Sequence, residues 1–306
     1  MVFGTSAFAV PSLERLAASE HQIVLCVTQP DRPQGRGLKG APSPIKQAAQ
    51  RLHLPMIQPP RPTAAVCDGL DADVGVVASY GTLISRDLLQ RFRCGLLGIH
   101  PSLLPKYRGA APVAWALLNG EARTGVTIFQ LDERLDAGPV LARCEVTIGP
   151  EEDAERLTDR LAHLGAEELL RVLTALEVGD ASATPQDDAQ ASLAPKLTKA
   201  HGRIDWRKSA EEIHRLVRAT VPWPSAHTQW RGQPLKMWAA SVTHGAAPRT
   251  PSHEPGTVVQ VTAQAILVAT GSGVLAVRDV QPAGRRRMSA EAFIAGYHLK
   301  AGDRLG

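Results

Sequence analysis

The sequence predicts an α/β protein in which a doubly wound, mostly parallel sheet is followed by a smaller antiparallel β-barrel. Three observations predict this fold class. Apolar runs alternate with helical patterns up to residue 176, a polar and alanine-rich stretch follows, and short alternating runs separated by turn residues come last. Because 306 residues exceed what one core usually organises, we expect two domains, at 1–179 and 203–306, joined by a linker at 180–202.

Short apolar runs predict the strands of the first domain. The run at 22–28 is rich in β-branched residues, as expected for a buried parallel strand. The first run is shorter than the usual five or six residues, so either residues upstream are missing or this strand is truncated. Without a G-x-G-x-x-G pattern after it, we do not predict NAD binding. Strands are predicted at 2–3, 22–28, 55–57, 73–79, 95–99, 124–131 and 140–148, with antiparallel edges, and helices at 11–19, 45–52, 85–92, 113–118 and 152–176.

The second domain begins with a helix and continues with strands. Ser209 and Glu212 form a capping box that opens a helix through Val217, ahead of Pro222. Turn residues separate the runs that follow, which is typical of a small antiparallel barrel. These runs lie at 226–230, 234–240, 256–263, 265–269 and 273–280.

Composition and charge narrow the class of protein. The net charge of +4 and the pI near 9.0 favour a polyanionic partner without requiring one. The four cysteines show neither C-x-x-C nor Cys/His ligand spacing, so we expect reduced thiols in a cytoplasmic protein and no metal site. No leader opens the chain and no apolar run approaches the ~18 residues that span a bilayer, so we expect no membrane partner. We also expect a monomer.

Basic residues gather in two places. The loop at 29–46 is rich in Pro and Gly and carries Arg32, Arg36, Lys39 and Lys46 against a single acidic residue, Asp31. Such a long loop is uncommon in a compact domain, and its composition fits either a solvated surface loop or a functional one. In the second half of the chain, from the linker onward, each basic residue alone fits solvated surface, but together they favour phosphate contacts. These residues are Lys196, Lys199, Arg203, Arg207, Lys208, Arg215, Arg218, Arg285, Arg286 and Arg287.

The stretch at 95–112 holds a strand, then His100, then a turn with two prolines. Ligands of open α/β sheets bind at the carboxyl ends of strands, so His100 lies where chemistry takes place. A second stretch, 131–141, places Asp136 in a turn. If Asp136 folds back on His100, the carboxylate stabilises an imidazolium and the two form an acid–base pair. Alternatively, His100 only caps a strand end and Asp136 only begins a turn.

These stretches resemble the formyltransferases that use 10-formyltetrahydrofolate. The resemblance rests on His-Pro-Ser-Leu-Leu-Pro-Lys-Tyr-Arg-Gly at 100–109 and Leu-Asp-Ala-Gly at 135–138. Further matching segments lie at 4–9, 28–33, 42–46, 125–128, 203–206 and 281–284, in the family's order. They span nearly the whole chain and are most similar to the branch that acts on initiator methionyl-tRNA. The resemblance implies a Rossmann-like first domain and an OB-like barrel.

The resemblance also implies a reaction, in which a formyl group moves from 10-formyltetrahydrofolate to the α-amine of methionyl initiator tRNA for translation initiation. It implies that His100 contacts the oxyanion and handles the proton, with Asp136 as its orienting partner. The basic loop would reach the acceptor stem of the tRNA, chiefly through Arg36 and Lys39. The folate co-substrate would bind the turn formed by Ser102, Leu103, Leu104 and Pro105, and further tRNA contacts would come from Arg32, Lys46, Arg285, Arg286 and Arg287.

One position departs from the family. These transferases place an asparagine two residues before the histidine, and its amide helps to hold the formyl oxygen, whereas this chain has Gly98. Losing one such donor typically costs about 10²–10³ in rate, so we expect Gly98→Asn to raise kcat at least about tenfold. A catalytically impaired tRNA-binding homologue is one alternative. Formyltransferases or hydrolases with a small acceptor are others, and the basic loop and second domain argue against them.

Overall fold

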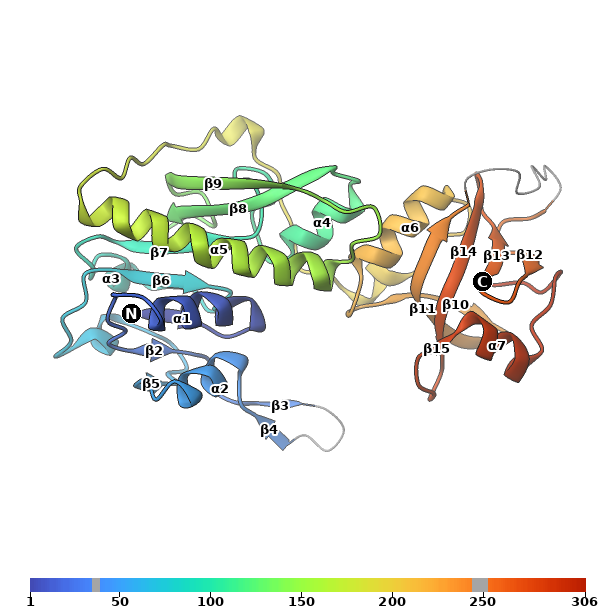
Figure 1. Cartoon of the computed structure of the whole chain (residues 1–306), viewed down its shortest axis with the longest axis horizontal. Coiled ribbons are helices and arrows are strands. Elements are labelled where there is room, and N and C mark those ends of the chain that lie inside the picture. The colour runs from blue at the N-terminus through green and yellow to red at the C-terminus, as the bar shows by residue number, and fades with distance from the viewer. Residues whose placement is uncertain (35–38, 244–252) are drawn as a thin grey trace. The chain divides into compact units, whose positions relative to one another are not determined.

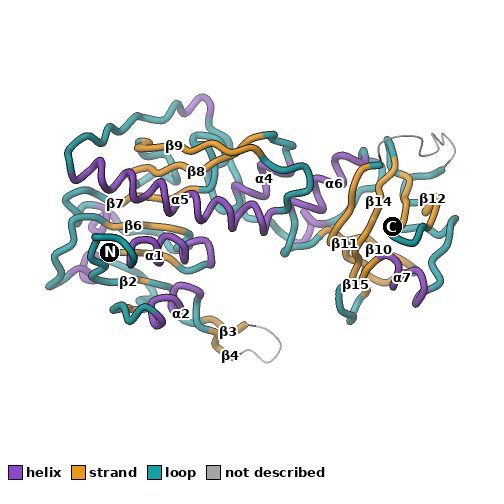
Figure 2. The backbone as a smooth tube through the Cα atoms, in the orientation of Figure 1, coloured by secondary structure: helices purple, strands orange, loops and turns teal. Residues whose placement is uncertain are grey.

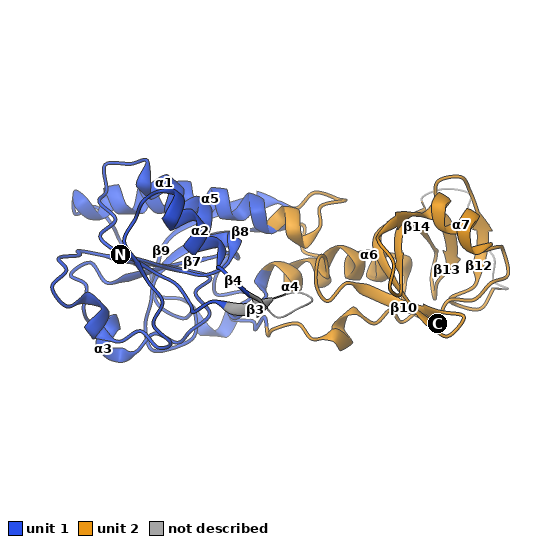
Figure 3. Ribbon diagram, turned by 90° about the horizontal axis from the view of Figure 1, so that it is seen from below, with its two compact units in different colours: residues 1–112, 123–147, 158–194 blue, residues 113–122, 148–157, 195–306 orange. Residues whose placement is uncertain are grey.

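The computed structural model describes residues 1–34, 39–243 and 253–306, which form two compact units (Figure 3). Unit 1 comprises residues 1–112, 123–147 and 158–194. Unit 2 comprises residues 113–122, 148–157 and 195–306. Residues 180–194 therefore belong to unit 1, and the domain bounds expected from composition stay a prediction.

Unit 1 is built on a seven-stranded sheet whose strands are β1 (Val2–Gly4), β2 (Cys26–Val27), β5 (Met56–Ile57), β6 (Gly75–Ala78), β7 (Leu96–His100), β8 (Arg123–Gln130) and β9 (Val140–Thr147). Their order is β5-β2-β1-β6-β7-β8-β9 (Figure 1). The strands from β5 to β7 are parallel, whereas β8 and β9 pair antiparallel. This arrangement confirms the predicted mostly parallel sheet with an antiparallel edge.

Helices cover both faces of this sheet. The helices are α1 (Val10–Ala17), α2 (Pro44–Arg51), α3 (Arg86–Leu89) and α5 (Ala154–Glu177), with short 3-10 helices at Ala7–Ala9 and Ala64–Cys67. α5 packs so closely on β7 that a Cβ at Gly165 would lie 2.8 Å from Ile99 Cγ2. Leu88 of α3 belongs to one cluster with Phe3 and Leu96. Leu96 and Ile99 are three positions apart on one strand, so their side chains point to opposite faces.

Three predicted elements of unit 1 differ from the structure. The strand expected at 22–28 is reduced to β2, because β1 and β5 each offer it only two paired residues. The loop expected at 29–46 contains an antiparallel hairpin, β3 (Arg32–Gln34) and β4 (Lys39–Ala41). The helix expected at 85–92 covers only residues 86–89.

Unit 2 contains the predicted antiparallel barrel. Its strands are β10 (Ala226–Trp230), β11 (Gln233–Val242), β12 (Val258–Val261), β13 (Ile266–Ala269), β14 (Val274–Pro282) and β15 (Met288–Ser289). They lie in the order β10-β11-β14-β13-β12, with β15 beside β14. Leu305 bridges to Trp230 at the end of β10, while Arg304 bridges to Thr257 just before β12. The segment that follows the last helix therefore connects the two edge strands and closes the barrel.

The helices of unit 2 are α4 (Pro112–Leu118), α6 (Ala210–Ala219) and α7 (Ala290–Tyr297), with a short 3-10 helix at Lys199–Gly202. The predicted capping box opens α6, since Ser209 Oγ accepts from the N–H of Glu212 and Glu212 Oε2 accepts from the N–H of Ser209. α7 was not predicted because its mostly apolar sequence has no polar face. It packs Phe293 edge-on against Trp230 in the barrel core.

The cysteines of the described residues are free thiols, as predicted. Cys26 is fully buried in β2, and this burial raises the pKa of its thiol to about 11. Within the part of the chain that the structure describes, no helix combines the length and hydrophobicity needed to cross a membrane.

Candidate active site

His100 ends β7 with a buried side chain whose two ring nitrogens have different neighbours. Nε2 lies 2.9 Å from the carbonyl oxygen of Tyr107. Because a carbonyl only accepts hydrogen bonds, Nε2 carries the hydrogen and donates it. Nδ1 faces Asp136 Oδ2 at 3.7 Å. A neutral His100 therefore presents the lone pair of Nδ1 on the side of Asp136.

Asp136 lies in the loop between β8 and β9, in the left-handed region with φ of 49°. Its Oδ2 accepts a hydrogen bond of 2.8 Å from the N–H of Gly109. The 3.7 Å between His100 Nδ1 and Asp136 Oδ2 is longer than a hydrogen bond. The structure thus brings the predicted pair together. The direct hydrogen-bond partner of His100 is the carbonyl of Tyr107, which accepts from Nε2; the sequence does not predict it because a backbone carbonyl leaves no side-chain signal.

The turn after His100 is held by internal hydrogen bonds. Ser102 is completely buried, and its hydroxyl donates to the carbonyl of Lys106 at 2.6 Å. Thr127 Oγ1 donates to the carbonyl of Ser102 and accepts from the N–H of Leu104. Leu104 is also buried, whereas Leu103 and Pro105 are partly exposed. Contact of these four residues with folate stays a prediction. Of the four, Leu103 and Pro105 present side-chain surface to a ligand.

Gly98 lies two residues before His100 and directly opposite Phe129 on β8. A Cβ built at Gly98 would lie 2.3 Å from Phe129 Cε1 and 2.6 Å from its Cζ. The phenyl ring is buried and packs in one cluster with Leu104 and Val140. It therefore fills the space that an asparagine side chain would need. For this reason Gly98→Asn alone is no longer expected to raise the rate.

The basic loop expected to contact tRNA is anchored at its base. Lys46 Nζ lies 2.6 Å from Asp31 Oδ2, and this hydrogen bond lowers the pKa of the Asp31 carboxyl. The ammonium of Lys46 is therefore already engaged within unit 1. Arg32 and Lys39 lie on β3 and β4, and Arg36 lies outside the described residues. Contact of these residues with tRNA stays a prediction.

The arginines expected to contact tRNA from the barrel lie between β14 and β15. Arg285, Arg286 and Arg287 are exposed. The guanidinium of Arg287 lies 5.5 Å from the ring centre of Trp238 and pairs with Asp279 at 2.5 Å. Proteins that bind single-stranded nucleic acids use such groups, since basic side chains contact the phosphates and aromatic rings stack on the bases.

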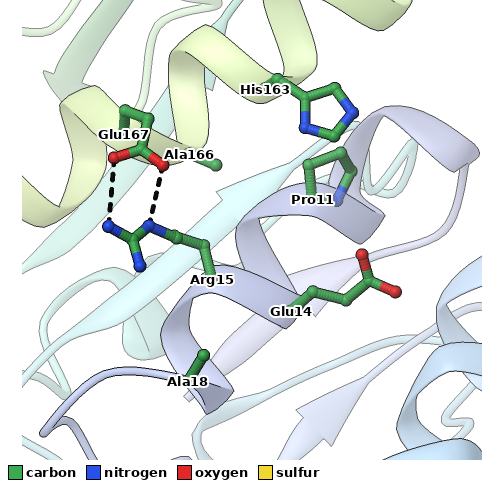
Figure 4. A pocket seen from close by; sticks show the side chains of 7 residues that line it. All are labelled: Pro11, Glu14, Arg15, Ala18, His163, Ala166 and Glu167. Atoms are coloured by element: carbon green, nitrogen blue, oxygen red, sulfur yellow. Dashed lines mark hydrogen bonds and ion pairs between the residues drawn. The ribbon is translucent and has the colours of Figure 1, made fainter.

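One cavity, of about 250 Å³, lies between α1 and α5 and contains none of the predicted site residues. Figure 4 shows Arg15 and Glu167 paired across it, with His163 and Glu14 on its walls. Among residues 1–34, 39–243 and 253–306, no three or more His, Cys, Asp or Glu side chains are placed to share a metal ion.

Comparison with known proteins extends over nearly the whole chain. A family profile described as "Formyl transferase" matches residues 1–173, and one described as "Formyl transferase, C-terminal domain" matches residues 196–298. The methionyl-tRNA formyltransferase of Solibacter usitatus (strain Ellin6076) is 44% identical over 308 residues, which cover 99% of this chain and 97% of the relative. The protein of the same name from Roseiflexus sp. (strain RS-1) is 47% identical and covers 99% and 94%.

Solved structures are similar in fold. The N-formyltransferase from Helicobacter canadensis, in complex with folinic acid and dTDP-3-aminofucose, has a TM-score of 0.70 at 17% identity and covers 92% of this chain and 98% of its own. HypX from Aquifex aeolicus, in complex with tetrahydrofolic acid, has a TM-score of 0.66 at 20% identity. This chain is covered to 98% but spans only 47% of HypX. At these identities the likeness establishes the fold alone.

Proposed function

Because the chain belongs to the formyl transferase family, among its methionyl-tRNA formyltransferases, we propose that it transfers a formyl group from 10-formyltetrahydrofolate to the α-amine of methionine on initiator tRNA. The observation that carries this proposal is the likeness to relatives of that name over 99% of the chain, at 44% and 47% identity. The catalytically impaired homologue and the enzymes with a small acceptor are not favoured by these relatives.

The reaction requires a neutral amine to attack the formyl carbon, an oxyanion to be stabilised, and a proton to move from the amine to the leaving nitrogen. His100 Nδ1 has the geometry for the proton transfer, since Nε2 donates to Tyr107 and leaves the Nδ1 lone pair free to accept. The imidazolium that forms lies 3.7 Å from the Asp136 carboxylate, which stabilises its charge. Nδ1 then returns the proton to the nitrogen that leaves, so that no net charge accumulates.

The co-substrate carries a flat ring system, which needs apolar walls. Leu103 and Pro105 of the turn supply partly exposed apolar surface. Leu83 and Leu135 are 87% and 63% exposed on two other loops of unit 1. An ion pair of 2.8 Å joins Arg86, the first residue of α3, to Glu133 in the loop that contains Leu135. Ser102 and Leu104 support this proposed site by holding the shape of the turn.

For the tRNA we propose contacts from the basic stretch at 29–46, with Arg36 and Lys39, and from Arg285 to Arg287 on the barrel. The charge of the first group and the exposure of the second support this assignment. One chain carries every residue of the proposed site, so a monomer suffices. We place the enzyme in the cytoplasm, where charged initiator tRNA is used.

The test is a formylation assay with labelled 10-formyltetrahydrofolate and initiator tRNA charged with methionine. Wild-type protein should place the label on methionine, and His100→Asn should abolish most of the transfer. Release of free labelled formate, or transfer to glycinamide ribonucleotide but not to the charged tRNA, would instead show one of the small-acceptor alternatives.

A further inference from the structure

Residues 184–194, which form part of the linker expected from sequence, run beside both loops of the proposed active site. Figure 2 shows this segment largely as loop with one short helical turn, the 3-10 helix at Asp188–Gln190. At one end Thr184 exchanges two backbone hydrogen bonds of 2.8 Å with Val140, after the Asp136 loop. At the other end Arg108 and Ala194 hydrogen-bond through their backbones, after the His100 turn. We call residues 184–194 the strap.

Gln186 of the strap uses its whole side-chain amide to join these loops. Its Oε1 accepts hydrogen bonds of 3.1 and 2.7 Å from Nε and Nη2 of Arg108. Its Nε2 donates to the carbonyls of Asp136 at 2.9 Å and Gly138 at 2.7 Å. An amide offers two donor hydrogens and two acceptor lone pairs, so all four are used. The side chain therefore connects the turn after His100 directly to the backbone of Asp136.

The two residues that the strap holds have unusual backbone conformations. Tyr107 and Asp136 lie in the left-handed region, with φ of 63° and 49°. Such conformations are costly and persist only where surrounding contacts determine them. Ser192 Oγ accepts a hydrogen bond of 2.9 Å from the N–H of Tyr107, whose carbonyl in turn holds His100. Both members of the catalytic pair are thus fixed through residues that the strap contacts.

Charged groups fix the strap itself. The guanidinium of Arg108 is buried and pairs with Asp188 at 2.7 Å. Asp188 also pairs with Arg134 at 2.9 Å, and Arg134 donates to the carbonyl of Ala137 beside Asp136. These pairs tie the strap to the same two loops as Gln186 does.

We propose that the strap positions the catalytic pair, with Gln186 acting through Asp136 and Ser192 acting through Tyr107 on His100. This inference rests on the proposed function, because it assigns roles within that site. Both are positioning residues, since neither side chain contacts His100 or the carboxylate of Asp136.

Gln186→Glu tests this role. The glutamate still accepts from Arg108, but it replaces the donating NH₂ by an oxygen that faces the carbonyls of Asp136 and Gly138. Because a displacement of 1 Å at a catalytic group costs on the order of 10² in rate, kcat should fall about 10²-fold. KM for charged tRNA should change less than about twofold, since no tRNA contact is altered. Gln190→Glu is the matched control, because that exposed side chain in the same strap hydrogen-bonds to Asp187, which belongs to the strap and not to either active-site loop.

A mutant cycle separates positioning from folding. If Gln186 acts through Asp136, then Gln186→Glu in an Asp136→Asn background should cost less than about threefold. Gln186→Met, which removes both the donors and the acceptor without adding charge, should lower kcat at least as much as Gln186→Glu. A loss of equal size in both backgrounds would overturn the proposal. So would a loss that disappears when rates are corrected for the folded fraction measured by thermal unfolding.

A readout without turnover keeps the two proposals distinguishable. The Cε1–H resonance of His100, assigned by its absence from the spectrum of His100→Asn, should move in Gln186→Glu and Gln186→Met and stay in place in Gln190→Glu. An unmoved resonance in both Gln186 variants would refute the strap as a positioning device. Wild-type protein that transfers no formyl group while the resonance moves as expected would refute the proposed function and leave the strap standing.

Discussion

Gly98 and Phe129 form a pair that must change together. A Cβ at Gly98 would lie 2.3 Å from Phe129 Cε1, more than 1 Å inside an ordinary contact. The ring cannot move aside freely, because it is 4% exposed and packed with Leu104 and Val140. Gly98→Asn alone should therefore lower stability by about 1–3 kcal/mol, as overpacked cores do. The rate should fall with it, because the displaced ring stands edge-on to His100.

Phe129→Leu removes the ring atoms that collide with the new side chain and keeps an apolar contact to the cluster. Alone it should cost about 2 kcal/mol, at ~0.8 kcal/mol for each buried carbon that leucine lacks. In the Gly98→Asn/Phe129→Leu double variant the asparagine fills part of that space, so the stability losses should not add. The amide can then reach the side on which His100 lies, and kcat should exceed that of Phe129→Leu by at least about tenfold, or 1.4 kcal/mol of barrier.

The assay is single-turnover formylation of charged initiator tRNA at saturating folate, with urea unfolding of all four proteins. Two results would refute this reasoning. If the Gly98→Asn variant unfolds in urea at the same midpoint as wild type and has a higher rate of formylation, the ring of Phe129 is no obstacle to the asparagine. A double variant no faster than Phe129→Leu, beside a wild type that turns over at a typical rate of ~1–10³ per second, would show that the amide is dispensable.

Three further predictions follow from the charged residues. The double variant Arg36→Ala/Lys39→Ala should weaken tRNA binding. It should also lower the slope of log affinity against log salt by about 0.9 for each phosphate that is no longer neutralised, while the folate affinity measured by fluorescence quenching stays constant. An equal loss of folate binding would contradict the assignment. His100→Ala and Asp136→Ala should each cost nearly as much kcat/KM as the double variant, whereas additive losses would mean that the two act separately. The hydrogen bond from Arg108 lowers the folded-state pKa of Asp188, so its stabilising contribution is complete above the unfolded value of about 3.9 and is lost as pH falls through the lowered value. Asp188→Asn should accordingly flatten the loss of melting temperature below about pH 4, and an unchanged acid limb would count against the pairing.

The sequence was sufficient to predict the sheet and the barrel because their signals are local. Apolar runs and turn residues predicted the parallel strands, the antiparallel edge and most strands of the barrel within a few residues. The elements that were predicted wrongly or missed depend on the neighbouring strands and core residues with which they pack. The run at 22–28 has strong strand propensity, but a strand pairs only as far as its neighbours extend, and β1 and β5 offered two residues each. The sequence of α7 is mostly apolar and has no polar face, so its helical structure is explained by the barrel core against which it packs.

In the proposed site, the approach of two side chains was predictable from the sequence, whereas the backbone groups that hold them were not. His100 and Asp136 were expected to meet, and they lie 3.7 Å apart. The carbonyl of Tyr107 and the N–H of Gly109, which hold them, have no sequence signature. The polar composition of residues 180–202 resembles a linker, because side chains that hydrogen-bond to loops are of the same types as those that face solvent.

The antiparallel pairing of β7 with β8 decides which residues build the site. In this register His100 lies opposite Thr127, and Gly98 lies opposite Phe129. Opposite residues of an antiparallel pair share a face. β8 therefore supplies both Thr127, which holds the Ser102 turn, and Phe129, whose ring fills the space at Gly98. A slip of one residue would move Thr127 and Phe129 to the α5 face and put the neighbouring residues of β8 in their places. The antiparallel neighbour of β7 therefore contributes part of the proposed site itself.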